Sequence, residues 1–276
     1  MNLSVDEPPP VDPGHLQPRL VGVFNWRGIW TLYAKEVQRF LRITMQSIVA
    51  PVVTTLLFQA VFSLAFGERN VLGGEVPFER FLAPGLIMMA IVQNSFANSA
   101  SSLLLSKIQG NIVDLMMPPL GPGELNFCFA FAAATRGVLC GSAVALGMVF
   151  FVDISVTHVW PIIFHGAAAG LLLGQIGITA GIWANKFDHM ATVTNFVITP
   201  LAFLSGTFYS IERLPEPWFA LSQINPFFYM IDGFRYGFID HADGALAAGV
   251  GIMIGLNAVM WISNYLILRS GYKLKS

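Results

Sequence analysis

The chain has 276 residues, of which 55% are hydrophobic and 11% are charged, and its formal net charge at pH 7 is -1. Its mean hydropathy is +0.64, and an ordinary soluble domain carries about 25% charged residues. A soluble fold of this size could not bury so much apolar surface, so the composition indicates an integral membrane protein. The 15 Lys and Arg residues are scattered along the chain, which argues against a nucleic-acid-binding protein.

The N-terminal segment is rich in proline. Met1–Leu20 lacks the basic start and apolar core of a signal peptide. We expect residues 1–25 to be a disordered cytoplasmic tail that precedes one transmembrane domain over residues 26–276.

The next segment, Trp26–Ile43, has helical spacing on two opposed faces. Trp26, Trp30 and Phe40 belong to the apolar face, and Arg27 belongs to the polar face. A basic amphipathic helix with tryptophans is typical of a helix lying flat at the cytoplasmic interface. A solvated juxtamembrane helix is the alternative.

Long apolar segments dominate the rest of the chain. A helix needs about 20 predominantly apolar residues to cross a bilayer. The sequence therefore predicts an all-α fold with six transmembrane helices near Ser47–Phe66, Phe81–Leu105, Phe127–Val152, Trp160–Ala184, Met190–Tyr209 and Ala245–Leu268.

The positive charges between these segments are distributed unevenly. Basic flanks are retained in the cytoplasm, so the richer set should lie inside, together with both chain termini. The flanks on the terminal side hold ten basic residues: Arg19, Arg27, Lys35, Arg39, Arg42, Lys107, Lys186, Arg269, Lys273 and Lys275. The opposite flanks hold four: Arg69, Arg80, Arg213 and Arg235.

Glycines recur every four residues in several predicted spans. Small residues on one helix face let backbones approach closely in a bilayer. We expect close packing at Gly137 and Gly141, at Gly166, Gly170, Gly174, Gly177 and Gly181, and at Gly251 and Gly255.

Motifs for catalysis are absent from the sequence. HExxH, GxxxxGK[ST] and GxSxG do not occur, and the five histidines are far apart in the chain. Cys128 and Cys140 would lie about 18 Å apart on one helix, too far for a disulfide. We therefore expect no metal site and no bound cofactor, with any ATP and Mg²⁺ held by a separate partner.

Two connections between the predicted spans have sequence patterns that suggest a function. The first is Lys107–Glu124, between the second and third spans. An amphipathic helix over Ile108–Met116, which ends before Pro118-Pro119, either rests on the membrane or docks into a groove of a partner protein. The apolar stripe of this helix comprises Ile108, Ile112, Leu115 and Met116. The polar positions beside the stripe are Asn111 and Asp114.

The second connection of this kind is Gly206–Asp240, which precedes the last span. It is too polar to cross the membrane and too aromatic to be a free loop, so we expect two short re-entrant helices that turn at Asn225-Pro226. Such a hairpin suits an external gate or exit collar. The candidate gate residues are Glu212, Pro215, Trp218, Asn225, Pro226 and Arg235.

At these two connections the sequence resembles the permease subunits of type-2 ABC exporters, a bacterial inner-membrane family. The resemblance is carried by Lys107-Ile-Gln-Gly, Asp114–Glu124, Ser205–Trp218 and Asn225–Arg235, and it extends from about Trp26 to the C-terminus. It implies an elbow helix at Trp26–Ile43, a coupling helix near Ile108–Met116 that seats on a separate ATP-binding subunit, and re-entrant helices at about Glu212–Tyr229. It also implies two permeases, here expected to be two copies of this chain, with the substrate path between them.

Several polar residues fall inside the predicted spans. Asn94 and Asn98 either bond between helices or line a polar substrate path. Arg136 either lies near the inner interface, because its helix begins well before it, or contacts a substrate or lipid phosphate.

Two other classes of protein fit the sequence less well. An intramembrane enzyme acting on lipid-linked substrates would use Asp188 and His189, or Asp232 and Arg235, but these pairs fall on opposite predicted sides. A passive channel would need a ring-forming charged or carbonyl motif that the sequence lacks. We therefore predict an exporter permease for a lipid, glycan or amphipathic drug-like substrate, whose identity composition does not reveal.

Overall fold

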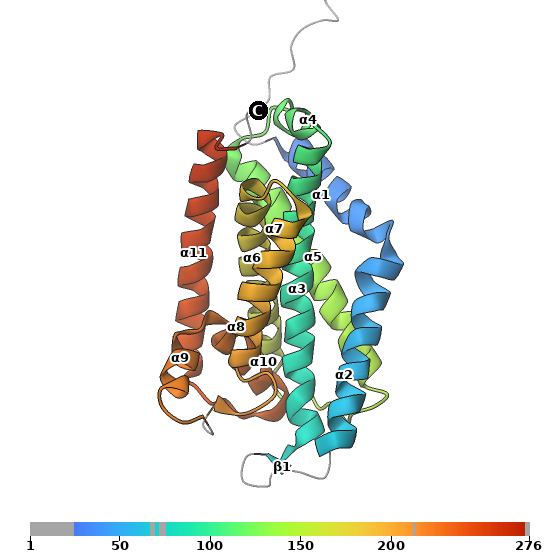
Figure 1. The fold of residues 1–276 in the computed structure, drawn as a ribbon, viewed down its shortest axis with the longest axis vertical. Coiled ribbons are helices and arrows are strands. Elements are labelled where there is room, and N and C mark those ends of the chain that lie inside the picture. Colours follow the sequence, from blue (N-terminus) through green and yellow to red (C-terminus); the bar gives the residue numbers. More distant parts are fainter. Residues whose placement is uncertain (1–24, 67–69, 72–75, 212–213, 274–276) are drawn as a thin grey trace, which may run out of the picture.

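The protein is a bundle of long helices, seen in a computed structural model that describes residues 25–66, 70–71, 76–211 and 214–273 (Figure 1). The predicted N-terminal tail lies outside this range except for Asn25. The helices, π-helical turns (η) and strands are α1 (Trp26–Leu41), η2 (Met45–Val49), α2 (Ala50–Phe66), β1 (Asn70–Val71), β2 (Val76–Pro77), α3 (Phe78–Ile108), α4 (Ile112–Met116), α5 (Pro122–Met148), α6 (Val159–Trp183), α7 (Phe187–Val193), η4 (Thr194–Ile198), α8 (Thr199–Leu204), α9 (Trp218–Ile224), α10 (Pro226–Ile239) and α11 (Leu246–Ser270).

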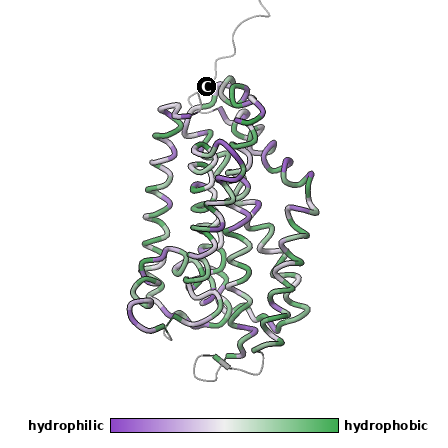
Figure 2. Tube along the Cα trace, in the orientation of Figure 1, coloured by the Kyte–Doolittle hydropathy of each residue, from purple (hydrophilic) through white to green (hydrophobic). Residues whose placement is uncertain are grey.

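Five helices of the described residues are long and apolar enough to cross a membrane. They are Met45–Phe66, Phe78–Ile108, Pro122–Met148, Val159–Trp183 and Leu246–Ser270, and they correspond to five of the six predicted spans. Figure 2 shows hydrophobic residues along these helices and more hydrophilic residues in the connecting segments.

The remaining predicted span, Met190–Tyr209, corresponds to a helical run from 187 to 204 made of α7, η4 and α8. Asp188, His189 and Asn195 lower the hydropathy of this run, which is not among the five candidate spans.

The bundle has two distinct ends (Figure 1). One, which we call the α4 end, holds α4 and the C-terminal end of α11, and the backbone amide of Asn25 just before α1 also lies there, bonded to Glu124. The other, the α9 end, holds α9 and the short antiparallel pair β1–β2.

The predicted amphipathic helix is present as α1, which ends at Leu41, two residues before the predicted end. Its buried face includes Ile29, Leu32 and Phe40. Trp30, which was predicted on the same apolar face as Phe40, is instead exposed, so that part of the prediction is wrong. The helix runs obliquely to the long helices (Figure 1), the geometry expected of an interfacial segment.

The core forms where α3 packs against α5 and α6, and glycines allow the contact. A Cβ atom at Gly177 of α6 would collide with the Ser99 hydroxyl and would lie 2.6 Å from the carbonyl oxygen of Phe96. At the same interface the Ser99 hydroxyl donates a hydrogen bond to the carbonyl oxygen of Gly174 at 2.6 Å. The predicted close packing is therefore present between these helices.

The glycines of α11 behave differently from this expectation. A Cβ atom at Gly251 or Gly255 would meet no described atom within 4 Å. The periodicity predicted close packing there, but α11 lies at the side of the bundle (Figure 1), with only 11% of its hydrophobic window buried. Spacing alone does not tell which neighbour a small-residue face has.

This difference gives a matched pair of substitutions. We expect Gly177→Ala to lower the stability of the purified protein by about 1–3 kcal/mol, because the added methyl group overpacks the interface of α3 and α6. Gly251→Ala should be neutral or stabilising by up to about 1 kcal/mol, since alanine is the better helix former. Unfolding curves in detergent measure both. Equal losses would contradict the close approach.

Candidate functional site

The predicted coupling helix is shorter than the sequence pattern indicated. Ile108 is the last residue of α3, and the backbone then breaks at Gly110, whose φ of 74° lies in the left-handed region that glycine tolerates. The helix α4 covers only Ile112–Met116. The predicted continuous helix over Ile108–Met116 is therefore wrong, although its end before the two prolines is confirmed.

This break changes which side chains are accessible at the α4 end. Ile112 is only 5% exposed and packs in the core, so little of its side chain is accessible. Val113 is 50% exposed and Met117 is 76% exposed. The accessible surface, which we call the α4 surface, comprises Ile108, Asn111, Val113, Asp114 and Met117, while Leu115 is half-buried against the core.

Glu124 joins the start of α1 to the segment after α4. Its carboxylate accepts hydrogen bonds from the backbone amide of Asn25 at 2.7 Å and from that of Gly121 at 2.6 Å. The Asn25 side chain donates to the carbonyl oxygen of Pro119 at 3.3 Å. These contacts fix the start of α1 beside the α4 surface, and no local sequence signal revealed the role of Glu124.

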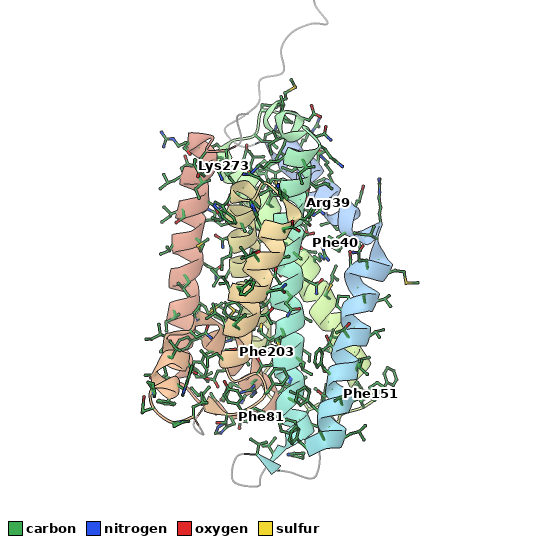
Figure 3. The ribbon with its side chains drawn as sticks, in the orientation of Figure 1. Arg39, Phe40, Phe81, Phe151, Phe203 and Lys273 are labelled. Atoms are coloured by element: carbon green, nitrogen blue, oxygen red, sulfur yellow. The ribbon has the colours of Figure 1, made fainter. Side chains whose placement is uncertain are left out.

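Lys107 connects α3 with the end of α6. Its ammonium group donates to the carbonyl oxygens of Ile182 and Ala184, both at 2.7 Å. The ammonium group of Lys273, which Figure 3 places at the same end, donates to the carbonyl oxygen of Trp183 at 3.0 Å. The last carbonyl groups of a helix have no partner within it, so the two lysines satisfy acceptors that would otherwise be open.

The polar residues predicted inside the spans form a cluster between α1, α3 and α5. Arg39 donates to the backbone oxygen of Asn98 at 2.9 Å and to its side-chain oxygen at 3.1 Å. Arg39 also pairs with Glu36 at 3.1 Å. Arg136 donates to the side-chain oxygen of Asn94 at 3.3 Å. Asn98 is therefore bonded to Arg39 of α1 and Asn94 to Arg136 of α5, in two hydrogen-bonded pairs that lie one turn apart on α3.

A groove of about 410 Å³ adjoins this cluster. It lies between α2, α3 and η4, and Figure 3 places Arg39 close to the α4 end of α2. The described lining residues are all uncharged, and they are Gln46, Ala50, Pro51, Thr54, Thr55, Phe58, Leu86, Met89, Ala90, Gln93, Asn94, Ala97 and Thr194.

The predicted helical hairpin of the second connection is present at the α9 end. The helix α9 is followed directly by α10, and the turn falls at Asn225-Pro226 as predicted, although α10 continues to Ile239. The Asn225 side chain caps α10 by accepting from the amide of Phe227 at 3.0 Å, and it donates to the carbonyl oxygen of Leu201 at 2.6 Å. Trp218 is exposed, and Glu212 lies outside the described residues.

Arg235 is the most enclosed of the predicted gate residues that are described. Only 2% of it is exposed. It donates to the carbonyl oxygen of Gly206 at 2.6 Å, and its guanidinium carbon lies 3.8 Å from the centre of the Phe81 ring, which Figure 3 labels at this end. Arg235 thus fixes α10 to the start of α3 and to the turn after α8.

Two aspartates hold the adjoining turn. Asp232 accepts from the backbone amides of Asp243 at 2.8 Å and Gly244 at 3.0 Å. Asp243 accepts from the Ser210 hydroxyl and the Ile211 amide, both at 2.9 Å, and pairs with His241 at 3.1 Å. The segment after α8 and the segment after α10 are therefore connected through one buried carboxylate.

The residues of the alternative enzyme hypothesis are not brought together. Asp188 and His189 belong to the start of α7, towards the α4 end, whereas Asp232 and Arg235 belong to α10 at the other end (Figure 1). Among the described residues, no group of three or more His, Cys, Asp or Glu side chains could hold a metal ion.

Asp240 and Asp243 lie close together after α10, and each pairs with a histidine, so they can be compared directly. Asp243→Asn should destabilise the purified protein by about 1–3 kcal/mol, since an amide nitrogen would then face one of the donors that the buried carboxylate accepts. Asp240→Asn should have little effect, because the Asp240 side chain is 59% exposed. Thermal unfolding in detergent measures both. A loss for Asp240→Asn as large as that for Asp243→Asn would contradict the assignment.

Comparison with known proteins agrees with this arrangement. The sequence pattern of the ABC-2 type transporter family matches residues 27–239. Inner membrane transport permease YadH of Escherichia coli (strain K12) is 34% identical over 252 residues, which cover 91% of this chain and 98% of that protein. Nodulation protein J of Sinorhizobium fredii (strain NBRC 101917 / NGR234) is 24% identical, with 81% of this chain and 85% of that protein covered. The chain therefore belongs to the ABC-2 type transporter family, as the membrane permease subunit of an ABC transporter that takes its ATP-binding subunit as a partner.

Proposed function

We propose that this chain is the permease of an exporter that moves a lipid, glycan or amphipathic drug-like molecule out of the cytoplasm or the inner leaflet. The observation that carries the proposal is the α4 surface, because an accessible apolar patch at one end of a membrane bundle suits the docking of a soluble subunit. The groove beside α2 and α3, uncharged and largely apolar, suits an amphipathic cargo.

The proposed topology has six crossings in a bacterial inner membrane, with both termini and the α4 end in the cytoplasm. The run from 187 to 204 would be the fifth crossing, and it is about 27 Å long at the usual helical rise. The positions of the helix ends support this crossing, since the starts of α1 and α7 and the end of α11 all lie towards the α4 end. A chain that starts and ends on the same side must cross the membrane an even number of times. Lys107, Lys186 and Arg269, at or near helix ends on that side, follow the rule that basic flanks stay inside.

Labelling of single cysteines tests this topology. The two native cysteines are buried and should give little background. Ser155→Cys should react with a membrane-impermeant maleimide in intact cells, whereas Gln109→Cys and Ser270→Cys should react only after the inner membrane is opened. Labelling of Ser270→Cys from outside would mean that the run from 187 to 204 does not cross.

The docking proposal predicts an effect of charge at the α4 surface. Val113→Glu should lower co-purification of the ATP-binding subunit by about tenfold, because a carboxylate would be buried at an apolar contact. Val156→Glu is the matched control, since Val156 is 56% exposed in the connection between α5 and α6 at the other end. Normal co-purification of Val113→Glu, or strong ATPase activity of this chain alone, would contradict the proposal.

We further propose that two copies of this chain form the membrane core, with membrane lipids around them and the substrate path between the copies. The groove is open to the side of the single chain and carries Asn94, so a second copy could close it. The mass of the complex that is purified in the docking experiment tests this: two permeases and two ATP-binding subunits are expected. A complex with one permease would contradict it.

The hairpin of α9 and α10 would be the external gate. Pro215, Trp218, Asn225, Pro226 and Arg235 belong to it or flank it. Reconstituted complexes with Asp243→Asn, which loosens the neighbouring turn, should hydrolyse ATP but transport less per ATP. An unchanged ratio of transport to hydrolysis would argue against a gating role.

A further inference from the structure

The cluster between α1, α3 and α5 holds more positive than negative charge. Arg39 and Arg136 bring two cations, and the carboxylate that contacts Arg39 is the buried Glu36. The contact of Arg136 that the hydrogen bonds define is the neutral side-chain oxygen of Asn94 at 3.3 Å. One positive charge is therefore left without a paired carboxylate in this group.

The cluster also has more hydrogen-bond donors than acceptors. The side-chain oxygen of Asn98 is used by Arg39, and that of Asn94 is used by Arg136. The amide nitrogen of Asn98, a residue with no exposed surface, has no acceptor, and neither does the buried Nε of Arg136. A ligand that satisfies the cluster must bring acceptor oxygens and negative charge.

A phosphate ester meets both requirements. Arginine guanidinium groups recognise phosphate through several parallel N–H donors, and the donors here come from three helices, α1, α3 and α5. Both arginine side chains are partly exposed, so a ligand can reach them. A phosphate ester carries three or more acceptor oxygens, whereas a carboxylate has only two.

The position of the cluster indicates what the phosphate is attached to. Asn94 belongs to both the cluster and the lining of the groove of about 410 Å³. Apolar side chains such as Phe58, Leu86 and Met89 line the groove beyond it. A ligand with its phosphate at Arg136 would therefore place hydrocarbon along α2 and α3.

We infer that Arg39, Asn98 and Arg136 form a phosphate subsite beside the groove, which it adjoins through Asn94, and that this subsite takes phosphate-bearing amphiphiles. This inference rests on the proposed permease function, because that function makes the groove a substrate path. In the proposed topology, Arg39 in the last turn of α1 lies on the cytoplasmic side of the subsite, and Arg136 lies near the middle of α5. The phosphate could thus belong to a lipid headgroup or be free inorganic phosphate.

The test is ligand binding to the purified full chain in dodecyl maltoside, without the ATP-binding subunit. The probes are dioctanoyl phosphatidic acid, dioctanoyl glycerol with the same chains but no phosphate, and inorganic phosphate. We expect phosphatidic acid to bind at least about tenfold more tightly than the glycerol. Arg136→Gln and Arg39→Gln should each weaken phosphatidic acid roughly tenfold or more and leave the glycerol unchanged.

Two further variants complete the design. Arg136→Lys, which keeps the charge but lacks the parallel N–H donors, should retain more phosphatidic acid affinity than Arg136→Gln but less than the wild type. Arg42→Gln, which changes an exposed arginine just after α1, should retain all of it. If Arg136→Gln does not fold, Arg39→Gln decides the question, since Arg39 is partly exposed at the edge of the cluster.

The outcomes answer two questions: whether the subsite exists, and whether it binds phosphate itself or a lipid headgroup. Displacement of phosphatidic acid by millimolar inorganic phosphate would support a subsite for phosphate itself, and resistance to displacement would support one for lipid headgroups. Equal affinity for the two dioctanoyl lipids, or wild-type phosphatidic acid binding by both glutamine variants, would overturn the inference. The assay needs no ATP-binding subunit, so its failure is distinct from failure of the docking experiment.

Discussion

The contact of α3 with α5 and α6 is the constraint on which the rest of the structure depends. Within the hydrophobic window of α3, 83% of the residues are buried, against 6% for the helix that begins at Met45. Lipid supplies no hydrophobic force between helices, so such a contact depends on close packing and on internal hydrogen bonds. Gly177 and the bond from Ser99 to Gly174 provide both. Contacts of α3 then extend along the bundle, from Phe81 at one end, through Asn94 and Asn98, to Lys107 at the other.

This central position explains how the α4 surface is connected to the bundle. Lys107 lies at the end of α3, directly before the turn into α4, and binds the last carbonyl oxygens of α6. Glu124, on the other side of α4, holds the start of α1. A force applied to α4 would thus act on α6 and α1 through charged hydrogen bonds, which are about twice as strong as neutral ones. The segment that follows α6 is the run from 187 to 204, which borders the groove through Thr194.

The sequence predicted those features that arise from local periodicity. Apolar runs located five candidate spans to within a few residues, and Asn225-Pro226 located the turn between α9 and α10. It did not predict features that need a neighbour distant in the chain. The apolar spacing from Ile108 to Met116 predicted one helix across Gly110, because residue spacing does not reveal where the backbone adopts a positive φ. The partners of Lys107 and Glu124 lie 75 and 99 residues away, beyond any local signal.

The charged groups at the two levels of the bundle are arranged in opposite ways. Near the α9 end, the buried Arg235 shares its surroundings with the carboxylates of Asp232 and Asp243, which also accept backbone and hydroxyl hydrogen bonds. Nearer the α4 end, Arg39 pairs with the carboxylate of Glu36, Arg136 donates to the neutral side chain of Asn94, and two buried donors of this cluster remain without acceptors. A buried carboxylate with several donors stabilises one fixed conformation, whereas an uncompensated cation favours an anionic ligand. The same residue types therefore give a closed structural joint at one end and, beside the uncharged groove, the phosphate subsite that we infer.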